Sequence, residues 1–167
     1  MAHPLPPGLC FLNWFVQRIC GINREYAWPV HYTSRVVGQV KIGRNVWKSF
    51  AASGGCYIQG GNGIEIGDDT LFAPGVKFIS ANHSLTDLKK WDPAPPIIIG
   101  KRCWIGANAV ILPEVVIGDE VVVGAGAIVS RSFPDGAIVA GTPAKLIKFR
   151  PDFEPEKEAI NEKIPQH

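Results

Sequence analysis

The sequence predicts an all-β fold, a parallel β-helix of hexapeptide repeats with a short N-terminal helix and a polar C-terminal tail. Three observations support this fold. An aliphatic residue recurs at every sixth position, a glycine often follows it directly, and a small or β-branched residue mostly stands four positions after it. The aliphatic positions are Ile99, Ile105, Ile111, Ile117, Val123 and Val129, and the positions four residues later are Cys103, Ala109, Val115, Val121, Ala127 and Phe133.

A six-residue period has a direct structural meaning. A short strand with a tight turn cannot bury its one aliphatic side chain alone, so successive units must stack, with strands about 4.8 Å apart along the axis. Three units make one coil, and the coils form a triangular prism whose narrow interior holds small side chains. Neither an amphipathic helix, with a period of about 3.6, nor an alternating strand, with a period of about 2, produces this pattern.

The repeat begins earlier in the chain. A first block in the same phase consists of Ile42, Ile66, Phe72 and Phe78. Between residues 48 and 62 the phase is irregular, because eight residues instead of six separate Ile58 from Ile66. The glycine-rich run at 60–63 therefore predicts an inserted corner.

Chain length indicates one domain. With 167 residues, 46% of them hydrophobic, the chain is long enough for one continuous core and too short for two well-formed cores. We divide it into an N-terminal apolar helical segment and lead-in (1–35), the β-helix domain (36–150, with a loop excursion at 84–96) and a polar tail (151–167). We expect the tail to be a short helix or disordered, and we assign no chemistry to it.

The apolar segment from Leu9 to Cys20 predicts a short helix. About a dozen mostly apolar residues fall well short of the ~20 that a membrane-spanning helix needs, and residues 1–8 lack the basic region of a signal peptide. An apolar stripe at helical spacing is formed by Leu9, Leu12, Phe15, Val16 and Ile19. We favour packing of this stripe over the end of the main domain. The alternative is an interfacial helix that brings the protein to a lipid-linked acceptor, with Trp14 and Arg18 at the headgroup level.

Composition excludes several classes of protein. Seventeen basic and fifteen acidic residues give a formal charge of +2, with no block of like charge that would suit a nucleic-acid-binding arm. The four cysteines are Cys10, Cys20, Cys56 and Cys103. They stand singly, without zinc or redox spacing, so we expect reduced thiols and a cytoplasmic protein.

Four motifs resemble those of a known family. They are Trp104-Ile105-Gly106-Ala107-Asn108, Ile117-Gly118-Asp119, Gly124-Ala125-Gly126-Ala127 and Ala140-Gly141-Thr142-Pro143-Ala144-Lys145. With these motifs the chain resembles the hexapeptide-repeat acyltransferases typified by maltose, galactoside and serine acetyltransferases, and especially small enzymes that acetylate sugars of bacterial surface polysaccharides. One departure is Glu114, where the family usually has glycine, so we expect a differently shaped corner there. The start of the chain also differs from the leaders of these relatives.

The resemblance implies several properties beyond the repeat itself. It implies left-handed winding, against the usual right-handed crossover rule. It also implies acetyl-CoA as the acyl donor and a homotrimer with active sites in the grooves between neighbouring prisms.

A long interruption of the repeat marks the candidate site. Phe78 and Ile99 are 21 residues apart where six would suffice, which leaves a 15-residue excursion. Insertions into a solenoid form loops on one face, and such loops carry function. His83 opens this loop, and the resemblance places the catalytic general base there, although a lone histidine is more often structural or solvent-exposed. Asn82 is a candidate to orient His83 or the acceptor.

Other residues are assigned to the two substrates. The residues that could line the acceptor site are Ser84, Leu85, Lys89, Lys90 and Trp91. For each of them, a side chain that is merely packed or exposed, with no role in binding, is an equal alternative. The resemblance assigns the oxyanion donor and pantetheine contacts to Ala107 and Ala125. It assigns the adenosine end of acetyl-CoA to Ser130, Arg131, Thr142, Lys145 and Lys148, although these basic residues could instead form a solvated face.

Two rival classes of protein share the prism. Carbonic anhydrases of this shape need three histidine ligands, whereas of His3, His31, His83 and His167 only His83 lies within the regular repeats, so we predict no metal site. A non-catalytic scaffold subunit would need no histidine at the loop. The expected reaction is O-acetylation of a sugar; an antibiotic or another small hydroxyl or amine acceptor is the alternative.

Overall fold

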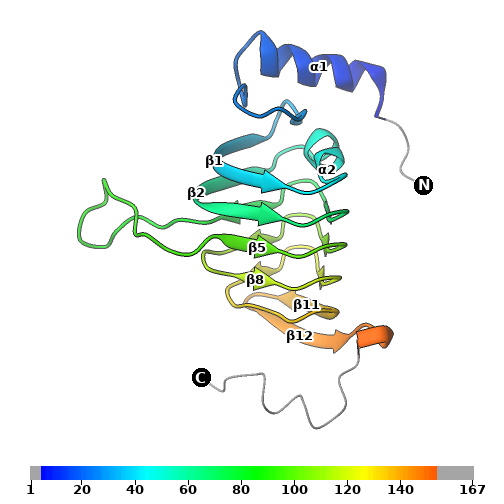
Figure 1. Ribbon diagram of the computed structural model, residues 1–167, viewed down its shortest axis with the longest axis vertical. Helices are drawn as coiled ribbons and strands as arrows, with labels where there is room; N and C mark the ends of the chain where they lie inside the picture. Colours follow the sequence, from blue (N-terminus) through cyan, green and yellow to red (C-terminus); the bar gives the residue numbers. More distant parts are fainter. Residues whose placement is uncertain (1–4, 154–167) are drawn as a thin grey trace.

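The computed structural model describes residues 5–153, which form a tall stack of short strands capped by one helix (Figure 1). The predicted tail therefore lies almost entirely outside the described residues. The elements in chain order are α1 (Pro7–Arg18), β1 (Arg35–Ile42), α2 (Trp47–Ala52), β2 (Tyr57–Ile66), β3 (Leu71–Phe72), β4 (Lys77–Ile79), β5 (Ile97–Ile99), β6 (Trp104–Ile105), β7 (Val110–Ile111), β8 (Val116–Ile117), β9 (Val122–Val123), β10 (Ile128–Val129), β11 (Ala137–Gly141), β12 (Ala144–Phe149) and the 3-10 turn η1 (Pro151–Phe153).

Parallel pairing arranges these strands into three faces. The first face stacks β1 and β2 through residues 35–37 and 57–59, then β4, β7 and β10. The second face stacks β1 and β2 through residues 40–42 and 64–66, then β5 and β8. The third face stacks β3, β6, β9 and β11. The chain visits the faces in this order, so the predicted prism of stacked parallel coils is confirmed.

The interior of the prism is filled as the repeat predicts. Ile99, Ile105, Ile111 and Ile117 are at most 1% exposed, and they point inward from all three faces. The predicted small positions Cys103, Ala109, Val115, Val121 and Ala127 are also buried. Burial of each of these aliphatic side chains stabilises the coil by roughly 1.5–3 kcal/mol relative to exposure, and the stack gains this term once per hexad. All four cysteines are free thiols; burial raises the pKa of the Cys56 and Cys103 thiols.

The corners use a left-handed backbone conformation at a fixed place in the hexad. The φ angles of Arg102, Asn108, Glu114 and Glu120 lie between +52° and +66°, and Gly126 follows at +68°. Our expectation of a differently shaped corner at Glu114 is therefore wrong. The corner keeps the shape of its neighbours, and a glutamate adopts a conformation that glycine would adopt without steric cost.

The irregular region around residue 60 is a corner inside a continuous strand. β2 runs without interruption from Tyr57 to Ile66, and its pairing with β1 shifts register between Gly38 and Val40. A Cβ added to Gly60 would overlap the backbone of Gln39, so the two coils approach too closely there for a side chain. The extra residues predicted as an inserted corner are accommodated in this bulge, which leaves Ile58 and Ile66 both buried.

The N-terminal helix α1 lies across the top of the prism, but not through its apolar stripe (Figure 1). Its buried residues are Asn13 and Gln17. Gln17 donates to the carbonyls of Asn23, Tyr26 and Trp28, and it accepts from the Val30 N–H. The expected short helix over the end of the domain is present, but the expectation that its apolar stripe packs there is wrong: Leu12, Phe15 and Ile19 are exposed, and Leu9 and Val16 are half-buried.

The lead-in segment after α1 uses polar side chains in the same way. Asn13 joins α1 to α2 and to the lead-in, because it donates to the Ala51 carbonyl and accepts from the Tyr32 N–H. Asn23 donates to the Ser34 carbonyl and accepts from the Val36 N–H. These buried amides satisfy backbone groups that have no strand partner. Within residues 5–153 no helix is long and apolar enough to cross a membrane.

Candidate active site

The predicted loop leaves the prism at the corner between the first and second faces. β4 ends at Ile79 and β5 begins at Ile97, and the segment between them projects sideways from the stack (Figure 1). Its two legs pair at the base. His83 and Trp91 form an antiparallel bridge, Ser84 donates its N–H to the Lys90 carbonyl at 2.9 Å, and Asp92 donates to the Asn82 carbonyl at 3.1 Å. The excursion is therefore a closed hairpin at its stem.

His83 is exposed and contacts Trp91 across this stem. The two rings lie 5.8 Å apart between centroids at 75°, an edge-to-face arrangement. The indole also packs on Gly61 of the coil above, where an added Cβ would overlap it. Within the described residues the imidazole of His83 makes no side-chain hydrogen bond. The aromatic contact with Trp91 is thus what fixes the ring within one chain.

Sequence reasoning missed the residues that hold the stem. The amide of Gln59 accepts from the Ser80 and Ala81 N–H groups at 3.1 and 3.0 Å, and it donates to the Ala81 carbonyl. Asn62 donates to the carbonyls of Ser80 and Asp92, one on each leg of the loop. The only signal for them is the position of two amide residues around the glycine-rich corner. They connect the base of the loop to the rigid coil above it.

The predicted acceptor-site residues differ in their surroundings. Leu85 is 95% exposed near the tip of the loop, and the Ser84 hydroxyl lies 3.0 Å from that of Thr86. Trp91, 43% exposed, leaves part of its indole open beside His83. Lys90 pairs with Asp87 within the loop at 3.4 Å, and Lys89 is exposed. Asn82 is exposed, and its side chain forms no hydrogen bond within residues 5–153.

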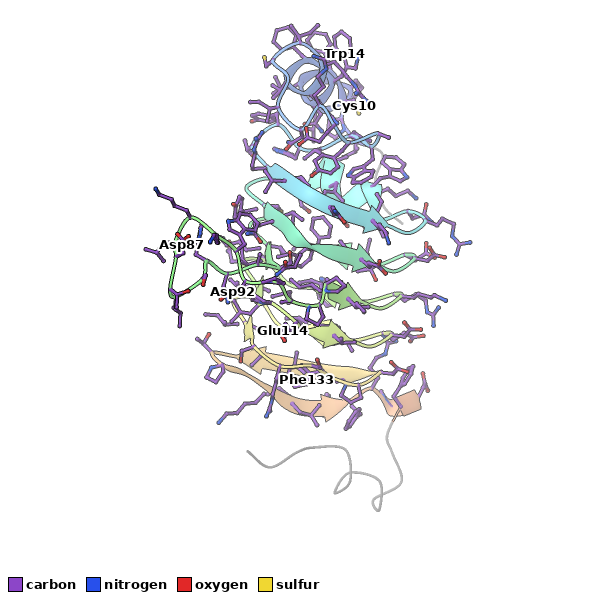
Figure 2. The ribbon with its side chains drawn as sticks, turned by 60° about the vertical axis from the view of Figure 1, so that its left-hand side comes forward. Cys10, Trp14, Asp87, Asp92, Glu114 and Phe133 are labelled. Atoms are coloured by element: carbon purple, nitrogen blue, oxygen red, sulfur yellow. The ribbon has the colours of Figure 1, made fainter. Side chains whose placement is uncertain are left out.

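Ser130 and Arg131 lie on the same corner as His83, two coils lower. They follow β10 as residues 80–96 follow β4. Figure 2 shows this edge, with Asp87 and Asp92 on the loop and Glu114 and Phe133 on the coils below. Both residues are exposed, and the Arg131 guanidinium lies 5.4 Å from the centre of the Phe133 ring. This corner therefore presents a histidine above a cation.

Most of the other predicted cofactor residues lie on a different corner, between the third and first faces. Ala107, Ala125 and Thr142 follow β6, β9 and β11, and they are stacked: the Gly126 N–H donates to the Ala107 carbonyl at 2.8 Å, and the Thr142 hydroxyl donates to the Gly126 carbonyl at 3.5 Å. Lys145 joins this corner, because it pairs with Ala140 at the end of β11. Lys148 pairs with Ile138 and lies farther along the third face.

The Ala107 and Ala125 N–H groups differ from their neighbours at this corner. Within the described part of the chain, neither donates to a backbone carbonyl, although the neighbouring Ala109 and Ala127 N–H groups do. A backbone N–H with no acceptor in the protein is what an oxyanion or an amide carbonyl of a ligand requires.

The two groups of candidates are separated by the whole first face. A face of about five residues at ~3.3 Å each puts the two corners roughly 15 Å apart. Proton transfer needs heavy atoms within about 3 Å. His83 and the alanine N–H groups of one chain therefore do not serve the same reacting atom.

The third corner, between the second and third faces, is occupied by ion pairs. Arg44 donates to Asp69 at 2.8 Å on the upper coils, and Arg102 donates through Nε to Glu120 at 2.8 Å below. Arg150 lies 3.6 Å from the same glutamate. These exposed pairs contribute little stability each. Ion pairs between coils are thus concentrated on this corner, in contrast to the two corners that carry the candidate residues. Within residues 5–153 no group of three His, Cys, Asp or Glu residues is placed to hold a metal ion.

Comparisons with known proteins find relatives in sequence and in fold. Residues 96–131 match the family model "Bacterial transferase hexapeptide (six repeats)". The chain is 35% identical over 130 residues to galactoside O-acetyltransferase of Escherichia coli K12, covering 74% of this chain and 61% of that one. It is 38% identical over 99 residues to a putative lipopolysaccharide biosynthesis O-acetyltransferase of the same organism, covering 51% and 50%. The chain thus spans about half to three fifths of the length of these relatives.

Solved structures show the same fold with the acyl donor bound. A hexapeptide-repeat acetyltransferase of Vibrio cholerae complexed with acetyl-CoA is 28% identical with a TM-score of 0.59, covering 70% of this chain and 63% of that one. A galactoside acetyltransferase in complex with coenzyme A is 26% identical with a TM-score of 0.61, covering 88% and 84%.

Proposed function

We propose that this chain, a relative of the hexapeptide-repeat acetyltransferases in sequence and fold, is an O-acetyltransferase that moves an acetyl group from acetyl-CoA to a hydroxyl of a sugar. The observation that carries the proposal is the exposed His83 on a braced loop at one corner of a hexapeptide prism. A scaffold subunit would need neither the loop nor a histidine held there. We expect the left-handed winding that the resemblance implies, and the cytoplasmic location that the singly placed cysteines indicate.

The chemistry requires a base and a donor to the developing oxyanion. The sugar hydroxyl gives its proton to a ring nitrogen of His83 while its oxygen bonds to the thioester carbonyl carbon. The free N–H of Ala107, or that of Ala125, donates to the carbonyl oxygen as charge develops on it. When the carbon–sulfur bond breaks, the sulfur takes the proton from the imidazolium, and His83 returns to its neutral form. The products are the acetyl ester and coenzyme A.

The separation of the two corners supports a site shared between copies of the chain. If His83 and the alanine N–H groups act on one thioester, they must come from two different chains. A closed ring uses a heterologous contact, in which one edge of each copy meets a different edge of the next. A homotrimer with three such grooves meets this requirement. Ser130 and Arg131 then enter the groove with His83, and Thr142 and Lys145 enter it with the alanines of the neighbour.

The acceptor class follows from the relatives and from the loop. One curated relative is named for a galactoside acceptor, and the other is named as a putative O-acetyltransferase of lipopolysaccharide biosynthesis. Trp91 leaves part of its indole open beside His83, which suits stacking on a sugar ring. We therefore assign the enzyme to the acetylation of sugars for bacterial surface polysaccharide. The half-buried Ser84 and the exposed Leu85 would complete the wall of that site.

The proposal is tested with purified protein and acetyl-CoA against a panel of hexoses and aminosugars. We expect release of free coenzyme A thiol with at least one acceptor, and a rise in melting temperature with coenzyme A alone. Hydrolysis without acceptor serves as the blank. A protein that is neither stabilised by coenzyme A nor active on any acceptor would be a scaffold subunit instead.

A further inference from the structure

The helix α1 is attached to the prism by its polar side. Asn13 and Gln17, four residues apart, are 1% and 3% exposed, and the amides of both donate and accept hydrogen bonds that join α1 to the lead-in and to α2. A surface helix of a globular protein normally buries its apolar stripe and exposes its polar one. Here the orientation is reversed. Six hydrogen bonds from the two amides attach the helix to the lead-in and to α2.

The opposite side of α1 is a continuous apolar face. We call it the aromatic cap; it consists of Phe11, Leu12, Trp14, Phe15 and Ile19, each between 36% and 64% exposed. The rings contact one another: Phe11 lies 6.1 Å from Trp14 and 6.2 Å from Phe15 between centroids. Single exposed apolar residues are ordinary, but a contiguous set of this size on one helix marks an interaction surface.

The direction of the cap argues against its burial in the proposed trimer. α1 lies across the N-terminal end of the stack, and Figure 2 shows Trp14 at the extreme end of the molecule, beyond the coil that begins with β1. Prisms that pack side by side bury their lateral faces and corners and leave their ends uncovered. In a ring of three parallel prisms, all three caps point the same way along the axis. They would form one apolar end of the assembly.

The charges on α1 and in the turn after it are mainly positive, although the exposed Glu25 directly follows Arg24. No acidic residue occurs between Leu5 and Arg24, whereas Arg18 and Arg24 are both exposed. The Arg18 guanidinium donates to the Arg24 carbonyl at 3.4 Å, which places the Arg18 charge beside the backbone of Arg24. Across a groove of about 740 Å³ between α1 and α2, Trp47 and Lys48 add a further aromatic residue and a further cation. Within residues 5–153 none of these three cations forms an ion pair.

We propose that the aromatic cap binds an anionic lipid surface, so that the enzyme works at the face of a membrane. Tryptophan and phenylalanine partition into the interfacial region of a bilayer, and arginine beside them attracts acidic headgroups. Both requirements are met within four residues by Trp14, Phe15 and Arg18. Three caps on one assembly would bind together, which strengthens a weak single contact. This inference does not depend on the acyltransferase activity.

The test is flotation of the full chain with vesicles of phosphatidylcholine alone or mixed with phosphatidylglycerol. We expect binding to the mixed vesicles that weakens as salt rises, because the arginines contribute through screened charge. The double variant Trp14→Ser/Phe15→Ser should lower vesicle binding at least about tenfold. Ile147→Ser is the matched control: Ile147 is 63% exposed on β12 at the other end of the prism, and its replacement should leave binding unchanged.

Two further measurements keep the outcome decisive. Both variants change exposed side chains, so unchanged circular dichroism and melting temperature establish that loss of binding is not loss of fold. Sizing with light scattering detects the alternative occupant, a second copy of the chain. The membrane proposal is overturned if the wild type does not bind anionic vesicles. It is also overturned if the wild type forms end-to-end pairs and the double variant does not. Acetyl transfer to a soluble acceptor without vesicles is measured separately, so failure of one proposal is distinguishable from failure of the other.

Discussion

The indole of Trp91 meets the imidazole of His83 edge to face, with ring centroids 5.8 Å apart, at the point where the loop closes on the prism. The same indole packs on Gly61, so its position is set by the coil above. Within one chain this contact restrains the otherwise exposed side chain of His83, the proposed base. We therefore propose Trp91 as a positioning residue for His83 as well as part of the acceptor site.

Replacement of Trp91 by leucine should lower kcat about tenfold and leave the KM for acetyl-CoA nearly unchanged, because a misplaced base costs turnover and not donor binding. Gly61→Ala should reproduce the effect from the other side, since the new methyl group displaces the indole. Trp91→Phe, which keeps an aromatic edge, should restore part of the rate. Leu88→Ala, at an exposed loop position, is the control. Equal losses in Trp91→Leu and Leu88→Ala would mean that the loop acts only as a lid.

His83→Ala should lower turnover by about 10²–10⁴ because the reaction loses its general base. Coenzyme A binding, measured by calorimetry, should remain, since the proposed contacts come from Ala107, Ala125 and Arg131. His83→Gln is the matched variant that keeps a polar side chain without a comparable base. A variant that retains more than about a tenth of wild-type turnover when chemistry limits the rate would remove His83 from the mechanism.

Arg131→Ala should raise the KM for acetyl-CoA about two- to fivefold, because an exposed phosphate contact contributes at most ~1 kcal/mol. The KM for the dephospho-CoA thioester should hardly change, since that donor lacks the 3′-phosphate. Lys101→Ala is the control: Lys101 is an exposed cation on the corner between the second and third faces, away from the proposed grooves. Arg131 does not contact this phosphate if both donors are affected equally.

The stack was predictable because each hexad carries its own signal. One buried aliphatic residue, such as Ile105, and one small residue, such as Ala109, recur at a spacing that no helix or sandwich strand shares. The corner at Glu114 was predicted wrongly for a physical reason. The left-handed conformation there is imposed by the coils above and below, so it persists without the glycine that would favour it locally.

The helix α1 shows that hydrophobic periodicity predicts a helix without predicting which side of it is buried. The spacing of Leu12, Phe15 and Ile19 correctly indicates a helix, but it does not say which side faces the protein. That was decided by Gln17, whose amide meets three lead-in carbonyls that have no strand partner. The geometry of the candidate site could not be predicted from the sequence for a similar reason. Gln59 and Asn62 act on residues about 20 to 30 positions away, and only the register of the coils brings them together.

Glu114→Gly should stabilise the protein by about 1 kcal/mol, because it relieves the left-handed strain of a residue with a Cβ. In a chain of this size that corresponds to a rise in melting temperature of roughly 2–4 °C. Glu120→Gly is the instructive comparison. Glu120 has a similar φ of 58°, but it also pairs with Arg102 and Arg150, so its replacement loses contacts along with strain. We expect a smaller gain or a net loss there. Equal shifts for both variants in a thermal melt would contradict this account.

The last prediction concerns the shared site, and it needs two inactive variants. His83→Ala removes the base from one corner, and Ala125→Trp fills the groove at the other corner, where Ala125 is exposed and a large side chain does not disturb the core. Each variant alone should be nearly inactive. Refolded together in equal amounts, they should recover about a quarter of wild-type activity, because about three quarters of random trimers contain both chains and each of these has one intact groove out of three.

The recovery is specific to a site made from two chains. If His83 and Ala125 served the same site within one chain, every site in a mixed trimer would carry one defect and activity would stay near zero. Unmixed variants taken through the same unfolding and refolding provide the control, and light scattering should give about three times 18.1 kDa for all samples. Mixed samples that form trimers without regaining activity would rule out the arrangement in which one copy supplies the base and its neighbour the oxyanion donor.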